Sequence, residues 1–137
     1  MTMYMLDTNI LIFCMRHPDS ICASTLAEHI GHDVCISVVT YAELEYVIVN
    51  SSFPERNRDA INKILAGIPI IDFDMKAAVH FGHILSELRQ KKKDKQNQDR
   101  DKMIAAHARS RGYTLVTDNI KDFIDIDGLK LDNWRAS

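Results

Sequence analysis

The sequence lacks the features that mark membrane proteins, repeat proteins and flexible multidomain chains. Its 137 residues contain no internal repeat and no linker rich in glycine, serine or proline. The longest apolar runs, Met3–Leu6 and Val47–Val49, are far shorter than the roughly 20 residues that cross a bilayer. No basic stretch followed by an apolar core marks a secretory signal. We therefore expect a single domain over residues 1–137 with no membrane contact.

Cysteine is scarce, and its pattern excludes two common kinds of small domain. The three cysteines, Cys14, Cys22 and Cys35, are odd in number and form no C-x-x-C pair. A disulfide framework and a zinc ribbon both need more cysteines in closer pairs. We expect the three to be buried as small hydrophobic residues in a cytoplasmic protein.

An excess of positive charge is also absent. The formal net charge is −2, although charged residues make up 26% of the chain. Modules that only bind nucleic acid are usually strongly basic, so this balance argues against such a module. It remains compatible with an enzyme whose acids gather around a cation, because a bound metal inverts the local charge.

Short apolar segments alternate with helical patterns along the chain. We predict strands at Met3–Leu6, Val34–Ser37, Ile68–Asp72, Tyr113–Thr117 and Leu129–Leu131. Helices are predicted at residues 8–17, 20–30, 40–50, 54–66, 74–91 and 101–111. This alternation predicts an α/β fold with a parallel sheet covered by helices on both faces. Ligands of such folds bind beyond the carboxyl ends of the strands.

Several acids fall at that edge of the predicted sheet. Asp7 follows the first strand, and Asp118 follows the fourth, beside Asn119. Glu43 is placed in the first turn of the helix after the second strand, and Asp101 at the start of the helix after a polar loop. Each has a purely structural alternative: a helix cap for Asp7 or Asp101, a favourable helix dipole for Glu43, and a turn for Asp118 and Asn119.

Taken together, these acids predict a metal site. Like charges held close to one another repel, so a cluster suggests a compensating cation. Ligands that are all oxygen favour Mg²⁺ or Mn²⁺. His80 and His83 are spaced to share a helix face but lack a third ligand, and His107 is interpreted as packing.

Four segments, in compatible order and spacing, carry a family resemblance. They are M-L-D-T-N-I at Met5–Ile10, S-V-V-T-Y-A-E-L at Ser37–Leu44, D-K-M-I-A-A-H-A-R-S-R-G at Asp101–Gly112 and L-V-T-D-N at Leu115–Asn119. The chain resembles the PIN-domain ribonucleases over nearly its whole length, and among them the VapC toxins of bacterial toxin–antitoxin pairs. The resemblance implies a PIN fold, a divalent cation, endonuclease activity on RNA such as transfer RNA, and inhibition by a cognate antitoxin.

Carried over by motif, the family's three acids are Asp7, Glu43 and Asp101. Its fourth position falls on Asn119, with Asp118 as the alternative metal ligand. Successive side chains of an extended segment point to opposite sides, so the two are not expected to face one metal together. We expect four neighbouring polar residues to orient the acids without binding the metal themselves, namely Thr8, Asn9, Ser37 and Thr117.

The chain departs from the family's pattern just before the third acid. Close relatives carry glycine and proline there, whereas this chain has the polar run Lys91–Asp101. Asp99 therefore competes for the position of the third acid, although the following M-I-A-A-H-A favours Asp101. The basic side chains of this run, Lys91, Lys92, Lys93 and Lys95, are either solvated or contact RNA phosphates.

These observations predict a magnesium-dependent endoribonuclease. The alternatives are a catalytically inactive PIN-like interaction domain and an aspartate-based phosphoacceptor or phosphatase. We also expect a homodimer, because the first and third helices carry surplus apolar residues, among them Ile12, Phe13, Tyr46 and Ile48. The expected partner is an antitoxin whose arginine or lysine enters the acidic groove.

Overall fold

The fold is built from short strands that alternate with helices, as the apolar pattern predicts. The computed structural model describes residues 2–94 and 99–135. The elements are, in order, β1 (Tyr4–Leu6), α1 (Thr8–Arg16), α2 (Ile21–His29), β2 (Val34–Ser37), α3 (Val38–Val49), α4 (Pro54–Leu65), β3 (Ile70–Ile71), α5 (Met75–Gln90), α6 (Asp99–Arg111), β4 (Thr114–Val116), the 3₁₀ helix η1 (Ile120–Asp122) and β5 (Lys130–Asp132).

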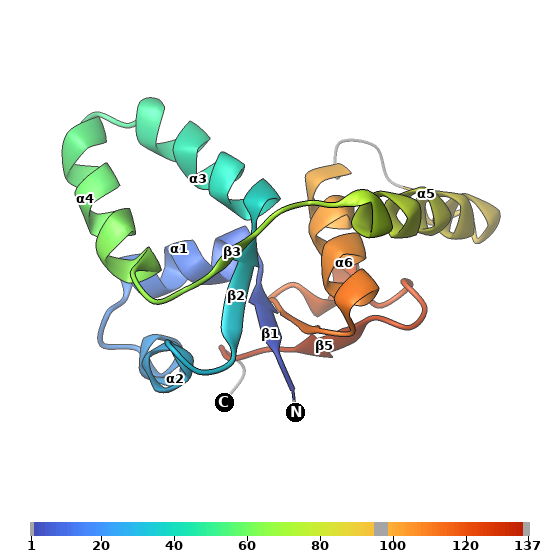
Figure 1. Cartoon of the computed structure of the whole chain (residues 1–137), viewed down its shortest axis with the longest axis horizontal. Helices are drawn as coiled ribbons and strands as arrows, with labels where there is room; N and C mark the ends of the chain where they lie inside the picture. Colours follow the sequence, from blue (N-terminus) through green and yellow to red (C-terminus); the bar gives the residue numbers. More distant parts are fainter. Residues whose placement is uncertain (1, 95–98, 136–137) are drawn as a thin grey trace.

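The strands form one parallel sheet in the order β3-β2-β1-β4-β5. In register, Met5 of β1 lies beside Cys35 of β2 on one side and Leu115 of β4 on the other. Helices α1–α4 cover one face, and α5 and α6 cover the other (Figure 1). The predicted parallel α/β sheet is confirmed, and all strands end at one edge.

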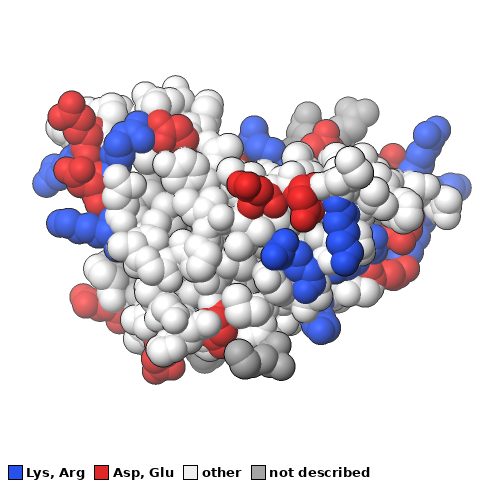
Figure 2. All heavy atoms as spheres, viewed as in Figure 1, with Lys and Arg blue, Asp and Glu red and all other residues white. Residues whose placement is uncertain are grey.

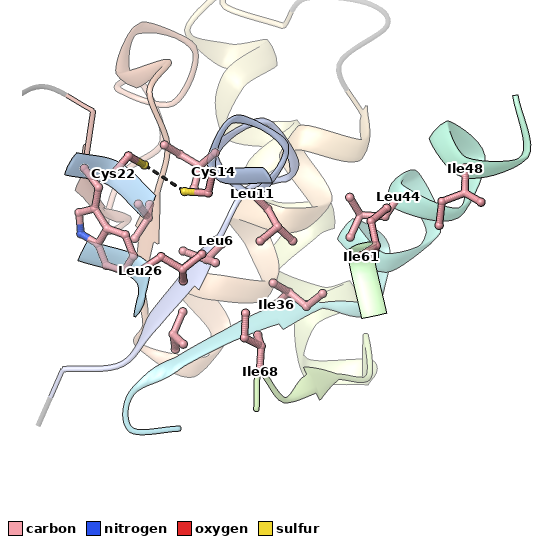
Figure 3. Close-up of a cluster of buried hydrophobic side chains, with 14 residues drawn as sticks. Leu6, Leu11, Cys14, Cys22, Leu26, Ile36, Leu44, Ile48, Ile61 and Ile68 are labelled. Carbon is pink, nitrogen blue, oxygen red and sulfur yellow. Dashed lines mark hydrogen bonds between the residues drawn. The ribbon is translucent and has the colours of Figure 1, made fainter. Parts of the chain in front are cut away.

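The strand residues alternate between two hydrophobic clusters. Leu6, Ile36 and Val116 belong to the cluster under α1–α4, part of which is drawn in Figure 3. Their neighbours Met5, Cys35 and Leu115 belong to the cluster under α5 and α6. Successive side chains of a strand point to opposite faces, so a strand buried on both sides reads as a continuous apolar run.

The cysteines are free and buried, as predicted. Cys14 and Cys22 join α1 to α2, with their Sγ atoms 3.3 Å apart, and Cys35 lies under the opposite face of the sheet. Burial raises the pKa of Cys14 to about 12 and that of Cys35 to about 11. Both thiols are therefore neutral and pack as small apolar groups.

Two predictions about the helices are wrong. α3 begins at Val38 rather than Thr40, because the Ser37 hydroxyl caps it by accepting a hydrogen bond from the Val39 amide at 3.1 Å. Glu43 consequently lies in the second turn of this helix, not the first. Ile48 is only 3% exposed in the first cluster, so it is not surplus surface, whereas Tyr46 is 69% exposed.

None of the helices in residues 2–94 and 99–135 is both long enough and apolar enough to span a membrane.

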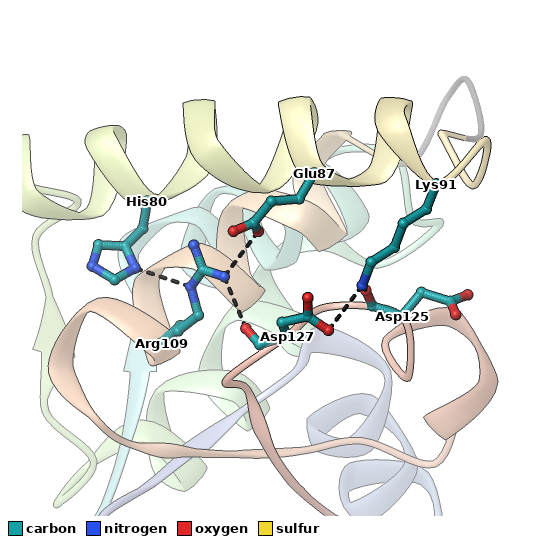
Figure 4. A network of polar contacts seen from close by, with 6 residues as sticks. All are labelled: His80, Glu87, Lys91, Arg109, Asp125 and Asp127. Atoms are coloured by element: carbon teal, nitrogen blue, oxygen red, sulfur yellow. Dashed lines mark hydrogen bonds and ion pairs between the residues drawn. The ribbon is translucent and has the colours of Figure 1, made fainter.

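Arg109 ties the segment after β4 to α5 and α6. Its guanidinium donates to His80 Nδ1 at 3.0 Å, Glu87 at 3.1 Å and the Asp127 carbonyl at 2.9 Å (Figure 4). His80 therefore acts as a hydrogen-bond acceptor here. Lys91 also holds this segment, because it donates to the Asp127 carboxylate and to the Asp125 main-chain carbonyl, each at 2.8 Å. The segment held in this way begins at η1, beside the acidic edge of the sheet.

We expect Arg109→Ala to lower the free energy of unfolding by about 2 kcal/mol, because it removes the donor of three hydrogen bonds in a half-buried network. Urea denaturation measures the change. Arg89→Ala, which removes an exposed arginine from α5, is the control and should stay within about 0.5 kcal/mol of the parent. Equal stability of the two variants would show that the network contributes little.

Candidate active site

The candidate site lies where the sheet strands end. The Asp7 amide donates to the Val116 carbonyl at 3.0 Å, and the Thr117 amide donates to the Asp132 carbonyl at 3.0 Å. The residues that follow β1 and β4 are thereby held side by side. They come from opposite ends of the chain, and the parallel pairing brings them together.

Asp7 is a helix cap and a buried acid at once. Its Oδ1 accepts a hydrogen bond from the Ile10 amide at 2.8 Å, so the capping interpretation is confirmed. The side chain is also 6% exposed. Burial raises its pKa to about 6, aided by the negative charges of Asp118 and Asp101 and opposed by hydrogen bonds from Thr117 and Ile10. The carboxylate is short of positive charge, as a cation ligand would be without its ion.

Asp101 and Glu43 extend the acidic edge to two helices. Burial raises the pKa of Asp101, and Glu43 and Asp122 add to the effect through their charges. Glu43 accepts from the Thr8 hydroxyl at 2.6 Å and from Arg100 Nε at 3.2 Å. Asp7, Glu43 and Asp101 therefore belong to one electrostatic cluster, although they come from the start of α1, from α3 and from α6.

The donor chemistry of this cluster fits a hard divalent cation, since every candidate ligand is an oxygen. Within residues 2–94 and 99–135, however, no three acidic, histidine or cysteine side chains are close enough to share one ion. Thr8 and Arg100 hold the Glu43 carboxylate, and the α1 amides hold one oxygen of Asp7.

The two candidates for the fourth position have different partners. Asp118 forms an ion pair with Arg135, at 2.5 Å between Oδ2 and Nη1. Asn119 donates from its side chain to Asp122, and its main-chain amide donates to the Thr117 hydroxyl at 3.0 Å. Asp118 still acts on the site through space, because its charge raises the pKa of Asp7.

Asp122 is a candidate site residue that the sequence analysis missed. It lies in η1, accepts the hydrogen bond from Asn119, and contributes to the raised pKa of Asp101. The available signal was its spacing. Residues three apart share one face of a helical turn, and Asp122 follows Asn119 by three.

The four predicted supporting residues divide by what they contact. Thr8 holds Glu43, and Thr117 bonds to Asp7. The remaining two do not touch the acids in any described contact. Ser37 instead bonds to Nδ1 of His107 at 2.8 Å, and Asn9 is exposed beside the edge.

His107 is fully buried and packs edge-on against the Phe73 ring, which confirms its interpretation as a packing residue. Because His107 lies in α6 and bonds to Ser37, the Ser37 hydroxyl points toward α6 and not toward the acids. Ser37 uses its one hydroxyl to cap α3 and to meet the imidazole.

The basic run lies at the far end of α5. Lys91 is engaged by the Asp125 carbonyl and the Asp127 carboxylate, while Lys92 and Lys93 are exposed. Lys95 falls outside the described residues. Contact of these lysines with RNA stays a prediction.

Comparisons with known proteins cover nearly the whole chain. The PIN domain family matches residues 4–129 of the chain. "Ribonuclease VapC2" of Haemophilus influenzae is 40% identical over 134 residues, covering 98% of this chain and 99% of that protein. "tRNA(fMet)-specific endonuclease VapC" of Shigella flexneri is 38% identical with the same coverage.

Two solved structures share the architecture. A chain of VapBC2 from Rickettsia felis, bound to a DNA fragment from its promoter, superposes with a TM-score of 0.88 at 37% identity and covers 97% of this chain and 99% of that one. A chain of DNA-bound VapBC from Salmonella typhimurium gives a TM-score of 0.89 at 34% identity, with 98% and 99% covered.

Proposed function

Because this chain belongs to the PIN-domain family, within its VapC group, we propose that it is a metal-dependent endoribonuclease and the toxin of a toxin–antitoxin pair. The observation that carries the proposal is the acidic edge itself. Three carboxylates, from the start of α1, from α3 and from α6, interact there, and burial and mutual repulsion raise the pKa of Asp7 and Asp101. A fold without a cation to bind would gain stability by replacing such acids.

The proposed metal is Mg²⁺ or Mn²⁺, held by Asp7, Glu43 and Asp101 directly or through water, with Asn119 or Asp118 completing the set. When bound, such an ion supplies a polarised water and neutralises charge on the phosphoryl oxygens. Thr8 orients the Glu43 carboxylate for this task, since its hydroxyl already donates to Oε1.

Two further contacts preorganise the edge. Thr117 bonds to Asp7 and accepts from the Asn119 amide, so one hydroxyl links the first acid to the fourth position. The Asn119 side-chain nitrogen donates to Asp122, which leaves the amide oxygen available as a ligand or an acceptor.

Transfer RNA is the first substrate to assay, because relatives from Shigella flexneri and Salmonella typhimurium are named tRNA(fMet)-specific endonucleases. Purified chain should cleave it in proportion to added Mg²⁺ and not at all in excess EDTA. Mapping the RNA ends identifies the cut. Cleavage that persists in EDTA contradicts a metal-dependent mechanism, and an inactive chain in Mg²⁺ and Mn²⁺ favours the interaction-domain alternative.

An antitoxin is proposed to silence the enzyme by occupying the groove beside Glu43. This pocket, of about 240 Å³, combines that carboxylate with the apolar side chains of Ile12 and Val47 and with the exposed ring of Tyr46. Arg100 already shows that a guanidinium fits the Glu43 carboxylate. A partner's arginine entering there would pair with the acids that the metal needs.

We expect a complex with the small protein encoded beside this gene to cleave no RNA across a Mg²⁺ titration, while the free chain cleaves. Co-expression, purification and the same cleavage assay test this. A complex as active as the free chain contradicts groove occupation. We also propose that the chain forms a homodimer in the cytoplasm, and light scattering at micromolar concentration measures its mass.

A further inference from the structure

A second hollow borders the acidic edge and adjoins the groove beside Glu43, with which it shares Asn9 and Ile12 of α1. It has a volume of about 520 Å³, within the usual range of roughly 300–1,000 Å³ for ligand pockets. Its lining includes Asn9 and Arg16 of α1, Phe13 between them, and Asp118 and Arg135 from the C-terminal part of the chain. Asn9 also lines the groove beside Glu43, and Asp118 is a candidate for the fourth metal position, whereas Phe13, Arg16 and Arg135 belong to neither.

Three flat groups lie together in the hollow, around the Phe13 ring. The Arg135 guanidinium lies 3.7 Å from the centroid of the Phe13 ring. On the same ring, the imidazole of His17 lies 4.4 Å away, centroid to centroid, at 34°. Guanidinium planes and aromatic rings are the surfaces on which proteins stack unpaired RNA bases.

Positive charge lies at the same place. Arg16 is exposed at the end of α1, and Arg135 spends one of its five N–H donors on Asp118. The other donors remain for a phosphate, which arginine binds with a planar fork. On the face drawn in Figure 2, basic side chains occur in small groups interspersed with acids. Because the net charge is −2, phosphates would bind at local groups of arginine and lysine side chains and not at a broad basic surface.

The hollow shares a wall with the acidic edge. Asn9 stands two residues after Asp7, and Asp118 directly follows Thr117, which bonds to Asp7. Asp118 also acts on Asp7 through its charge. A nucleotide seated here would place the adjoining RNA backbone at the acids.

We infer that the hollow between α1 and the C-terminal segment is a nucleotide-binding subsite, which stacks an unpaired RNA base on the flat groups of Arg135, Phe13 and His17 and contacts its phosphate through Arg16. The inference rests on the proposed ribonuclease function and adds the part of the chain that holds RNA beside the reacting bond.

RNA binding by the purified full chain in EDTA tests the subsite without any catalysis. The probe is fluorescent transfer RNA, followed by anisotropy over a salt series. Arg16→Gln and Phe13→Leu are each expected to weaken binding at least about fivefold. Arg16→Gln should also reduce the slope of log K against log salt by about 0.7, the change for one lost single-strand phosphate contact. Arg16→Lys keeps the charge and should keep the slope.

The matched control is Arg56→Gln, which removes another arginine that lies over a phenylalanine ring, 5.8 Å from the Phe53 centroid and outside the hollow. It should bind RNA as the parent does. In Mg²⁺, Arg16→Gln should raise KM and leave kcat unchanged. If the parent cleaves no RNA, the proposed function fails, yet the EDTA measurement still decides the inference.

Parent-like RNA binding by both Arg16→Gln and Phe13→Leu overturns the subsite. So does a loss of binding that light scattering traces to a changed oligomeric state, because Ile12 and Phe13 of the hollow are also among the apolar residues expected in the homodimer interface. Circular dichroism identifies a variant that fails to fold. Arg16 is exposed, so its substitution leaves the core intact and the result interpretable.

Discussion

Asp7→Asn should lower RNA cleavage at least about 100-fold and, without metal, make the protein more stable. The activity should fall because the amide keeps the volume and the cap of α1 but removes the charge that a divalent cation needs. Cleavage of transfer RNA at saturating Mg²⁺ measures the loss. Asp59→Asn, an exposed acid on α4, is the control and should retain full activity. Undiminished cleavage by Asp7→Asn would refute the assignment.

The stability gain follows from the pKa of Asp7, which folding raises from 3.8 to about 6. Between these values the folded protein holds more protons than the unfolded chain, so its stability falls as pH rises through this window. Raising this pKa from 3.8 to about 6 lowers the free energy of unfolding by about 3 kcal/mol above pH 6. Well below pH 3.8 the carboxyl is protonated in both states, and this loss of stability disappears.

Asparagine carries no such cost. We therefore expect Asp7→Asn to exceed the parent in free energy of unfolding by about 2 to 3 kcal/mol at pH 7.5, with the difference shrinking toward zero near pH 4. Urea denaturation in EDTA at several pH values measures it. Added Mn²⁺ should stabilise the parent and leave the variant unchanged. A difference independent of pH would show that the Asp7 charge is not the cause.

Asp101→Asn should lower cleavage at least about 100-fold, whereas Asp99→Asn should change it less than about threefold. Both acids lie in the first turn of α6, so both substitutions weaken the interaction with the helix dipole similarly. They differ in surroundings. Asp101 is partly buried among Glu43 and Asp122, which raise its pKa, while Asp99 is exposed.

Cleavage and Mn²⁺ binding of the two variants decide between the two acids. We expect the metal affinity to fall only for Asp101→Asn. The reverse result, with Asp99→Asn inactive, would shift the motif by two residues and remove Asp101 from the site. Equal activity of both variants with the parent would exclude either acid as a necessary ligand.

The fold was predictable because the three central strands, β1, β2 and β4, are buried on both faces. The continuous apolar runs at Met3–Leu6 and Val34–Ser37 have no other stable place than a covered parallel sheet. The helix boundaries were less predictable. Ser37 is the last residue of β2, and its hydroxyl also caps α3, so the helix begins directly after the strand. The predicted start at Thr40 therefore placed Glu43 one turn too early.

The position of the site was predictable from topology, but the direction of its side chains was not. Parallel strands end together, so acids that follow β1 and β4 had to meet at one edge. The direction of each side-chain oxygen depends on hydrogen-bond and ion-pair partners that are distant in sequence. Asp118 pairs with Arg135, and Ser37 turns to His107, 70 residues away.

The sequence by itself determined the elements and the parallel sheet, because hydrophobic periodicity is a local property of the chain and short apolar strands that alternate with helices pair in parallel. The tertiary structure alone decided that Asp122 joins the edge, that Ile48 is buried, and that the Arg135 guanidinium lies on Phe13 beside the acids. These outcomes depend on long-range side-chain contacts, whose partners become neighbours only after the sheet and its helices have packed.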